Sequence, residues 1–269
     1  MRSKYKRHLA LIVLVLGSMG CAEHQPRLVI TGASTMAPVI AELAERYEAQ
    51  GGGLVDVQTG GSGRGLLDAR QGLADFGMVS RDLQEDELDL QSWVLADDGL
   101  ALIIHQDNPV TALSDEQVRA IFRGEVRRWS ELGGADRPIT VVHKAEGRST
   151  QTLFVSHFGL RNSEVRPSTV IGDNQQGILS VLNDPNAIGY VSIGAALFAQ
   201  QQGRPLRLLP LDGVAATLDQ VASGTFPLSR PLLLVRGQPL DDPARDFIAF
   251  ITDPQQRDIY EGYYFVPRH

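Results

Sequence analysis

Serine, threonine and glycine gather in three short clusters, and these residues are the ones in this sequence best suited to bind a ligand. The clusters cover 31–35, 60–65 and 147–150, and each lies between a predicted strand and a predicted helix. A helix N-terminus offers free N–H groups and a partial positive charge, hydroxyls add donors, and glycine lets the backbone approach a ligand. Any one cluster could be an ordinary helix cap or turn. Three of them, with Ser80-Arg81 after a further predicted strand, indicate a site for a small multivalent oxyanion.

The motifs of common enzyme classes do not fit the chain. Ser62 lacks the glycine two residues later that an esterase elbow needs, because Arg64 stands there. No segment has the Gly-Lys-Ser/Thr ending of a nucleotide P-loop. The six histidines are scattered without a His-x-x-x-His pair, and we expect His143 at a strand end on the surface rather than as a general base. We therefore expect no catalytic residue, no metal and no cofactor.

Composition narrows the class of protein further. The chain has 269 residues, 43% of them apolar, which is typical of a globular protein of one large domain or two lobes. One cysteine excludes a disulfide framework, a cysteine-rich zinc site and an iron–sulfur cluster. The formal charge of −7 argues against a nucleic-acid partner, which would favour a basic face.

Residues 1–21 have the features of an export signal rather than of a folded element. The first eight residues carry four Lys or Arg, an apolar run covers 9–16, and Cys21 follows small residues. This pattern resembles a bacterial lipoprotein signal, in which Cys21 becomes the lipidated N-terminus. Ser18 stands where such signals usually carry leucine, so cleavage after Ala22 is the alternative. We expect a periplasmic or cell-envelope protein anchored to a membrane through Cys21, more readily the outer than the inner membrane of a two-membrane cell.

The remaining chain alternates short apolar runs with amphipathic stretches, which predicts an α/β fold. Ser114 and Gln117 have the spacing of a capping box and predict a helix start. The predicted strands cover 28–30, 54–57, 76–79, 100–105, 139–143, 188–192 and 231–235. The predicted helices cover 36–48, 66–74, 114–122, 150–158, 177–182, 243–251 and 254–260.

The clusters and their order resemble the substrate-binding proteins of phosphate ABC transporters, in the type II periplasmic-binding-protein superfamily. Segment 31–38 is similar to the first anion loop of that family, 61–65 to its glycine-rich loop, 75–81 to the Ser-Arg variant of its third loop, and 144–150 to its Arg-x-x-Gly-Ser-Gly-Thr loop. The resemblance runs over 28–267. Its downstream part lies in segments 174–177, 186–191, 227–231 and 262–267.

The resemblance implies a two-lobed Venus-flytrap fold with the ligand between the lobes. Lobe one would hold 27–105 plus 228–269, and lobe two would hold 106–227. The two hinge crossings would lie near 105–108 and 226–229. It also implies a non-enzymatic, monomeric phosphate receptor that delivers inorganic phosphate to an inner-membrane ABC permease. Two alternatives stay open: a binder of sulfate, molybdate or tungstate, and a phosphate sensor or envelope interaction protein without a transport role.

The resemblance also assigns the binding residues. Lys144 stands where the family often has arginine, and Arg148 is placed to take over that role. Arg81 and Arg148 would supply charge-assisted hydrogen bonds, which are about twice as strong as neutral ones. The expected ligand-binding set is Ser34, Thr35, Ser62, Gly63, Ser80, Arg81, Lys144, Arg148, Ser149 and Thr150.

A carboxylate that accepts the proton of hydrogen phosphate is not identified by the sequence. Many phosphate binders carry an aspartate in the third loop, but this chain has Ser80-Arg81 there. Such an acceptor would separate phosphate from sulfate, because sulfate has no proton to donate at neutral pH. The candidates are Asp82, Glu146 and Asp173.

Overall fold

The computed structural model describes residues 27–268 of the chain. The export signal predicted over 1–21 and its lipidation site Cys21 lie outside the described residues. Strands and helices alternate along the described chain, which confirms the predicted α/β class. Among residues 27–268, no helix is long and apolar enough to cross a membrane.

The strands form one continuous, mixed sheet in the order β2-β1-β3-β9-β4-β7-β5-β6, with β8 and β10 also paired to β4. β1 pairs in parallel with β2 and β3, and β5 pairs in parallel with β6 and β7. β9 and β4 are antiparallel to their neighbours and join the two parallel groups. The strands are β1 Arg27–Gly32, β2 Leu54–Thr59, β3 Phe76–Val79, β4 Gln91–His105, β5 Thr140–Lys144, β6 Thr169–Ile171, β7 Ala187–Ser192, β8 Leu206–Leu208, β9 Ser229–Arg236 and β10 Val266–Pro267.

Helices cover the sheet, and five of those in residues 27–268 begin at a residue whose side chain caps a backbone N–H, namely α3, α5, α6, α7 and α8. The capping box at Ser114 is confirmed: its hydroxyl accepts from Gln117 N at 3.2 Å, and Gln117 Oε1 accepts from Ser114 N at 2.8 Å. The helices are α1 Ala37–Ala49, α2 Ser62–Gln71, α3 Asp115–Arg123, α4 Ser149–His157, α5 Asn174–Asn183, α6 Ile193–Gln201, α7 Leu218–Ala222, α8 Asp242–Ile251 and α9 Arg257–Gly262.

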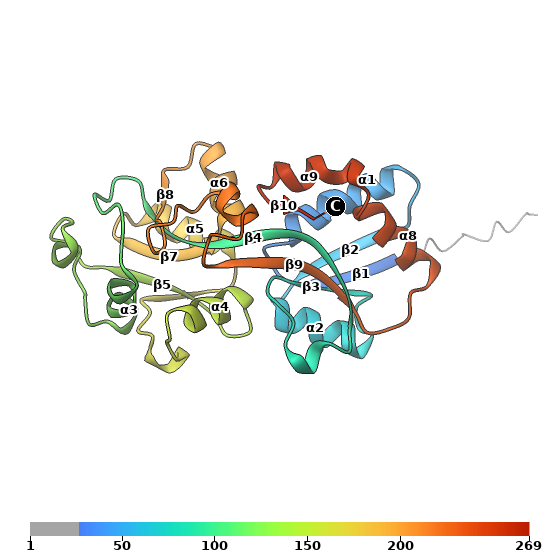
Figure 1. The fold of residues 1–269 in the computed structure, drawn as a ribbon, viewed down its shortest axis with the longest axis horizontal. Helices are drawn as coiled ribbons and strands as arrows, with labels where there is room; N and C mark the ends of the chain where they lie inside the picture. The colour runs from blue at the N-terminus through green and yellow to red at the C-terminus, as the bar shows by residue number, and fades with distance from the viewer. Residues whose placement is uncertain (1–26, 269) are drawn as a thin grey trace, which may run out of the picture.

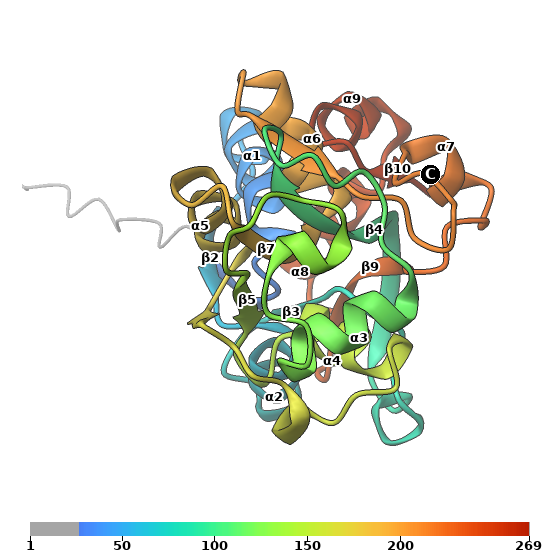
Figure 2. The same cartoon turned by 90° about the vertical axis from the view of Figure 1, so that its left-hand side faces the viewer.

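Two large apolar cores lie at opposite ends of the long strands β4 and β9. One core combines α1, β1, β3, α8 and α9, and the other combines α3, α4, β5, β7 and α7 (Figure 1). Figure 2 looks onto the end of the molecule that carries α3 and β5. β4 pairs with β9 up to Gly99 and with β7 from Leu100 onward. The lobe boundaries at 105 and 228 stay predictions, and this change of partner favours a first crossing near Gly99.

Candidate anion-binding site

The loops that follow β1, β2, β3 and β5 meet around a small cavity. Each loop leads from a strand toward the next helix, so the sheet brings together segments more than a hundred residues apart. Seven of the ten residues predicted from the sequence line this cavity, and Gly63, Arg81 and Lys144 do not. The lining residues are Ala33, Ser34, Thr35, Gly61, Ser62, Ser80, Arg148, Ser149 and Thr150.

Three buried serines from three loops form the floor of the cavity. Ser62 Oγ donates to Ser149 Oγ at 3.1 Å, and the hydroxyls of Ser80 and Ser149 lie 2.5 Å apart. The backbone N–H of Ser80 donates to Ser62 Oγ at 3.1 Å. A hydroxyl carries one donor and two acceptor lone pairs, and it rotates to suit its partner. The three hydroxyls can therefore turn toward the oxygens of a bound anion.

Helices α1, α2 and α4 begin beside the cavity, and none has a side-chain cap on its first N–H groups. Gly61, the N-cap residue of α2, has a φ of 91°, a conformation that favours glycine. A Cβ at Gly61 would lie 2.8 Å from the backbone oxygen of Gly147 across the cavity. Glycine therefore allows the two loops to approach, and the uncapped N–H groups and helix dipoles favour an anion there.

Arg148 is the cation best placed for direct contact with an anion. It lines the cavity, is half-buried, and immediately precedes α4. Within residues 27–268 its guanidinium makes no hydrogen bond or ion pair. Five N–H donors next to a cluster of hydroxyls are thus available for a ligand.

Arg81 lies outside the cavity wall, contrary to its expected place in the binding set. Its guanidinium donates two hydrogen bonds of 2.7 Å to the Glu87 carboxylate and a third to the backbone oxygen of Asp82. This pair lowers the pKa of the Glu87 carboxyl. The loop after β3 therefore presents Ser80 to the cavity and turns Arg81 toward the acidic turn at Glu85–Glu87.

Arg230 and Asp98 form a fully buried ion pair behind the cavity, and sequence reasoning did not single out either residue. Arg230 Nη2 lies 2.8 Å from Asp98 Oδ2, and the side chains are 1% and 0% exposed. The same guanidinium donates to Thr35 Oγ1 at 3.3 Å and to Ser80 Oγ at 3.4 Å. It therefore holds two hydroxyls of the cavity wall. The available signal was an arginine directly before the apolar run of strand β9.

Lys144 is also buried behind the wall rather than in it. Its Nζ donates to Asn174 Oδ1 at 2.9 Å, and Asn174 Nδ2 donates to Thr35 Oγ1 at 3.1 Å. Burial, and then the charge of Arg230, lowers the pKa of Lys144 to about 7.

The backbone N–H of Gly63 donates to Gly147 O at 3.4 Å and so links the two loops without lining the cavity.

His143 is buried, so its expected position at the surface is wrong. Its ring nitrogens face the Tyr190 hydroxyl and Asn162 Oδ1, each at 2.9 Å. Burial lowers the pKa of the imidazole. These partners satisfy the ring in the interior, and His143 does not line the cavity.

Comparisons with known proteins agree with this geometry. Residues 20–255 match the PBP superfamily domain. The phosphate-binding protein PstS of Bacillus subtilis is 30% identical over 207 residues, covering 75% of this chain and 67% of the relative. The crystal structure of an ABC-type phosphate transport receptor from Vibrio cholerae superposes with a TM-score of 0.73 at 31% identity, covering 89% of this chain and 99% of that one.

A further structure, from Clostridium perfringens and solved with bound phosphate, is provisionally assigned as a phosphate ABC transporter substrate-binding protein. It superposes with a TM-score of 0.82 at 29% identity and covers 91% of this chain and 100% of that one. These matches confirm the binding-protein fold that the resemblance implied. The chain belongs to the PBP superfamily.

Proposed function

We propose that this protein binds inorganic phosphate in the cavity and delivers it to the permease of an ABC transporter. The observation that carries the proposal is the composition of the wall: serine and threonine hydroxyls, three helix starts without a side-chain cap, and the guanidinium of Arg148, which has no partner within residues 27–268. The relatives named for phosphate binding support the same ligand. A receptor of this kind carries its ligand unchanged, and we assign no catalytic role to the cavity.

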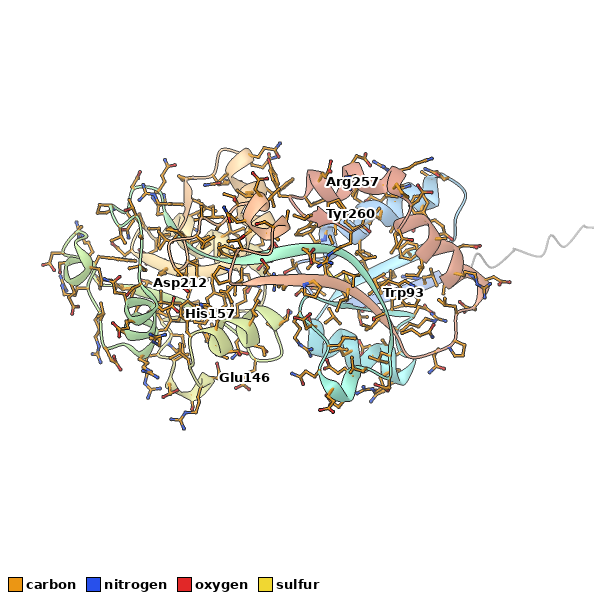
Figure 3. The ribbon with its side chains drawn as sticks, in the orientation of Figure 1. Trp93, Glu146, His157, Asp212, Arg257 and Tyr260 are labelled. Carbon is orange, nitrogen blue, oxygen red and sulfur yellow. The ribbon has the colours of Figure 1, made fainter. Side chains whose placement is uncertain are left out.

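None of the three candidate proton acceptors lines the cavity. Glu146 accepts a hydrogen bond of 2.6 Å from Asn162 Nδ2, and Figure 3 places it at the loop before α4. Asp173 accepts from Gln176 N at 2.8 Å as the cap of α5, and Asp82 is exposed. A serine hydroxyl can accept the proton of hydrogen phosphate instead. The wall without a carboxylate makes sulfate, molybdate or tungstate the second candidate ligand, since no acidic side chain in the lining repels them.

Titration calorimetry with phosphate, sulfate and molybdate tests the proposal, on protein first freed of ligand by unfolding and refolding. Phosphate should bind one to one and more tightly than the other two anions. At about 100 times its Kd, phosphate should stabilise the fold by about 2.7 kcal/mol, which a thermal scan detects. Binding of sulfate or molybdate with no response to phosphate would refute the phosphate assignment and retain the second candidate.

The cellular setting belongs to the same proposal. We propose export through the signal over 1–21 and attachment to a membrane through Cys21, so that a monomeric receptor stays near its permease. The relatives are named as phosphate-binding proteins and transport receptors, which supports a place outside the cytoplasmic membrane. The alternative of a phosphate sensor is tested by deleting the gene for this protein and measuring phosphate uptake: loss of a transport receptor should lower the rate of uptake, whereas a sensor without a transport role should leave the uptake rate of the permease unchanged.

A further inference from the structure

Three side chains that could ligate a metal meet in the half of the molecule that carries α3 and α4, outside the anion cavity. Asp115 is the first residue of α3, His157 is the last residue of α4, and Asp212 lies in the turn between β8 and α7. One ligand atom from each, a ring nitrogen and two carboxylate oxygens, lie within 4.8 Å of one another. Figure 3 shows His157 and Asp212 in this half, away from β1 and β2.

Two polar atoms of these side chains are buried and have no hydrogen-bond partner among the described residues. Asp115 Oδ1 and His157 Nε2 are inaccessible to solvent and make no hydrogen bond within residues 27–268. Buried polar atoms are almost always paired, because an unpaired one forfeits its bonds to water. An imidazole nitrogen and a carboxylate oxygen that lie close together without a hydrogen-bond partner are donors of the kind that a metal ion uses.

The neighbouring groups leave the three side chains available. His157 Nε2 lies 3.5 Å from Asp115 Oδ2, longer than a good hydrogen bond. Arg119 Nη1 stays 3.9 Å from the same oxygen, so it does not neutralise the carboxylate through a hydrogen bond. A pair of reciprocal backbone bonds between Leu211 and Val214, of 2.9 and 2.8 Å, fixes the turn that carries Asp212.

The donor set selects the kind of metal. Calcium and magnesium prefer oxygen ligands alone, whereas one imidazole with two carboxylates suits zinc. Zinc bonds of about 2.0–2.2 Å set the ligand atoms of a tetrahedral site about 3.3–3.5 Å apart. The distance of 3.5 Å between His157 Nε2 and Asp115 Oδ2 already fits, and Asp212 lies in an exposed turn within 4.8 Å of both side chains.

We propose that Asp115, His157 and Asp212 form a zinc-binding site, with water as the fourth ligand. The ion would tie the start of α3 and the end of α4 to the turn before α7. These segments are more than forty residues apart in sequence, so the bond would stabilise this half of the protein against local unfolding.

Calorimetry with zinc chloride on the chelator-treated protein, in phosphate-free buffer, tests the proposal. One zinc ion should bind per chain and raise the Tm, and cobalt in its place should give the strong visible absorption of a tetrahedral site. His157→Ala and Asp212→Asn should each raise the Kd for zinc at least about tenfold. Both variants should bind phosphate as the parent does, so this test stands apart from that of the proposed function.

Asp107→Asn is the matched control, because Asp107 Oδ2 lies 3.6 Å from the His105 ring without a third ligand near it. It should leave zinc binding unchanged. Asparagine tolerates the φ of 49° at position 212. Asp212→Asn should therefore fold, and it tests the zinc site even if His157→Ala does not fold. No zinc binding by the parent, or binding unaltered in Asp212→Asn, would overturn the proposal.

Discussion

Replacing Arg148 by alanine separates a ligand-binding arginine from a structural one. Arg148 lines the cavity and has no hydrogen bond or ion pair within residues 27–268. A hydrogen bond to a charged group contributes about 1.5–3 kcal/mol. Since 1.4 kcal/mol is a factor of ten, Arg148→Ala should weaken phosphate binding by about 10- to 150-fold in a calorimetric titration.

The same substitution should leave the free energy of unfolding almost unchanged. Arg148 is half-buried, and its guanidinium stabilises no other described side chain, so the change should stay within about 0.5 kcal/mol in a urea titration of the ligand-free protein. Arg148→Lys should recover only part of the affinity, because an ammonium group cannot donate in the planar fork of a guanidinium.

Arg81→Ala is the comparison, with the opposite pattern expected. It removes two hydrogen bonds to Glu87, whose side chain is 10% exposed, so unfolding should become easier. Phosphate affinity should stay within about twofold, because Arg81 lies outside the cavity wall. If Arg81→Ala loses tenfold or more in affinity while Arg148→Ala binds as the parent does, the assignment of the two arginines is reversed.

Three further outcomes follow from other parts of the chain. Burial lowers the pKa of Lys144 from 10.5 to about 7 in the folded protein. Between pH 7 and pH 10.5 the unfolded state therefore binds one more proton than the folded state, so the free energy of unfolding should rise with pH. Lys144→Met should abolish this rise between urea titrations at pH 7 and pH 9. A Cβ on Gly77 would collide with the carbonyl of Gly65 in α2, so Gly77→Ala should lower the free energy of unfolding by about 1–3 kcal/mol. Gly133→Ala is the control, because nothing lies near its Cβ and it should cost only the strain of its φ of 79°. Cys21→Ser should release the protein from membranes in a fractionation experiment, and a mature N-terminus at Glu23 would instead show cleavage after Ala22.

The glycine and hydroxyl clusters predicted the cavity well, because each lies at the end of a strand in one sheet. Loops at the carboxyl ends of parallel strands meet at one edge, which accounts for the loops after β1, β2 and β3. The loop after β5 belongs to the other parallel group, and only the fold shows that it reaches the same cavity. The hydrophobic periodicity of the sequence did not predict α6, Ile193–Gln201, because its residues are mostly apolar and show no polar face. The strand predicted from the same periodicity, 100–105, is shorter than β4, which covers Gln91–His105. The reason is that Asp97 and Asp98 interrupt the apolar run.

The side-chain partners of the charged residues could not be predicted in the same way. Arg81 and Arg230 each follow or enter an apolar strand, and nothing local distinguishes them. Only the fold shows that Glu87 lies within reach of Arg81 and that Asp98 lies opposite Arg230 across the β4–β9 pairing. In the sequence the buried Asp98 appears only as an interruption of an apolar run. Its role in an ion pair becomes visible only when its partner Arg230, more than 130 residues away, is placed beside it by the fold.

The same partners explain how a chain of net charge −7 can offer a site for an anion. Arg230 carries its charge next to the cavity, but Asp98 balances it and Ser192 and Gly194 donate to the other oxygen of that carboxylate. The pair therefore orients Thr35 and Ser80 without adding much net charge. Attraction for the ligand then comes from Arg148, the hydroxyls and the helix N–H groups, all of which act at short range. Because this attraction does not depend on the field of the whole protein, the affinity should change little between low and physiological salt.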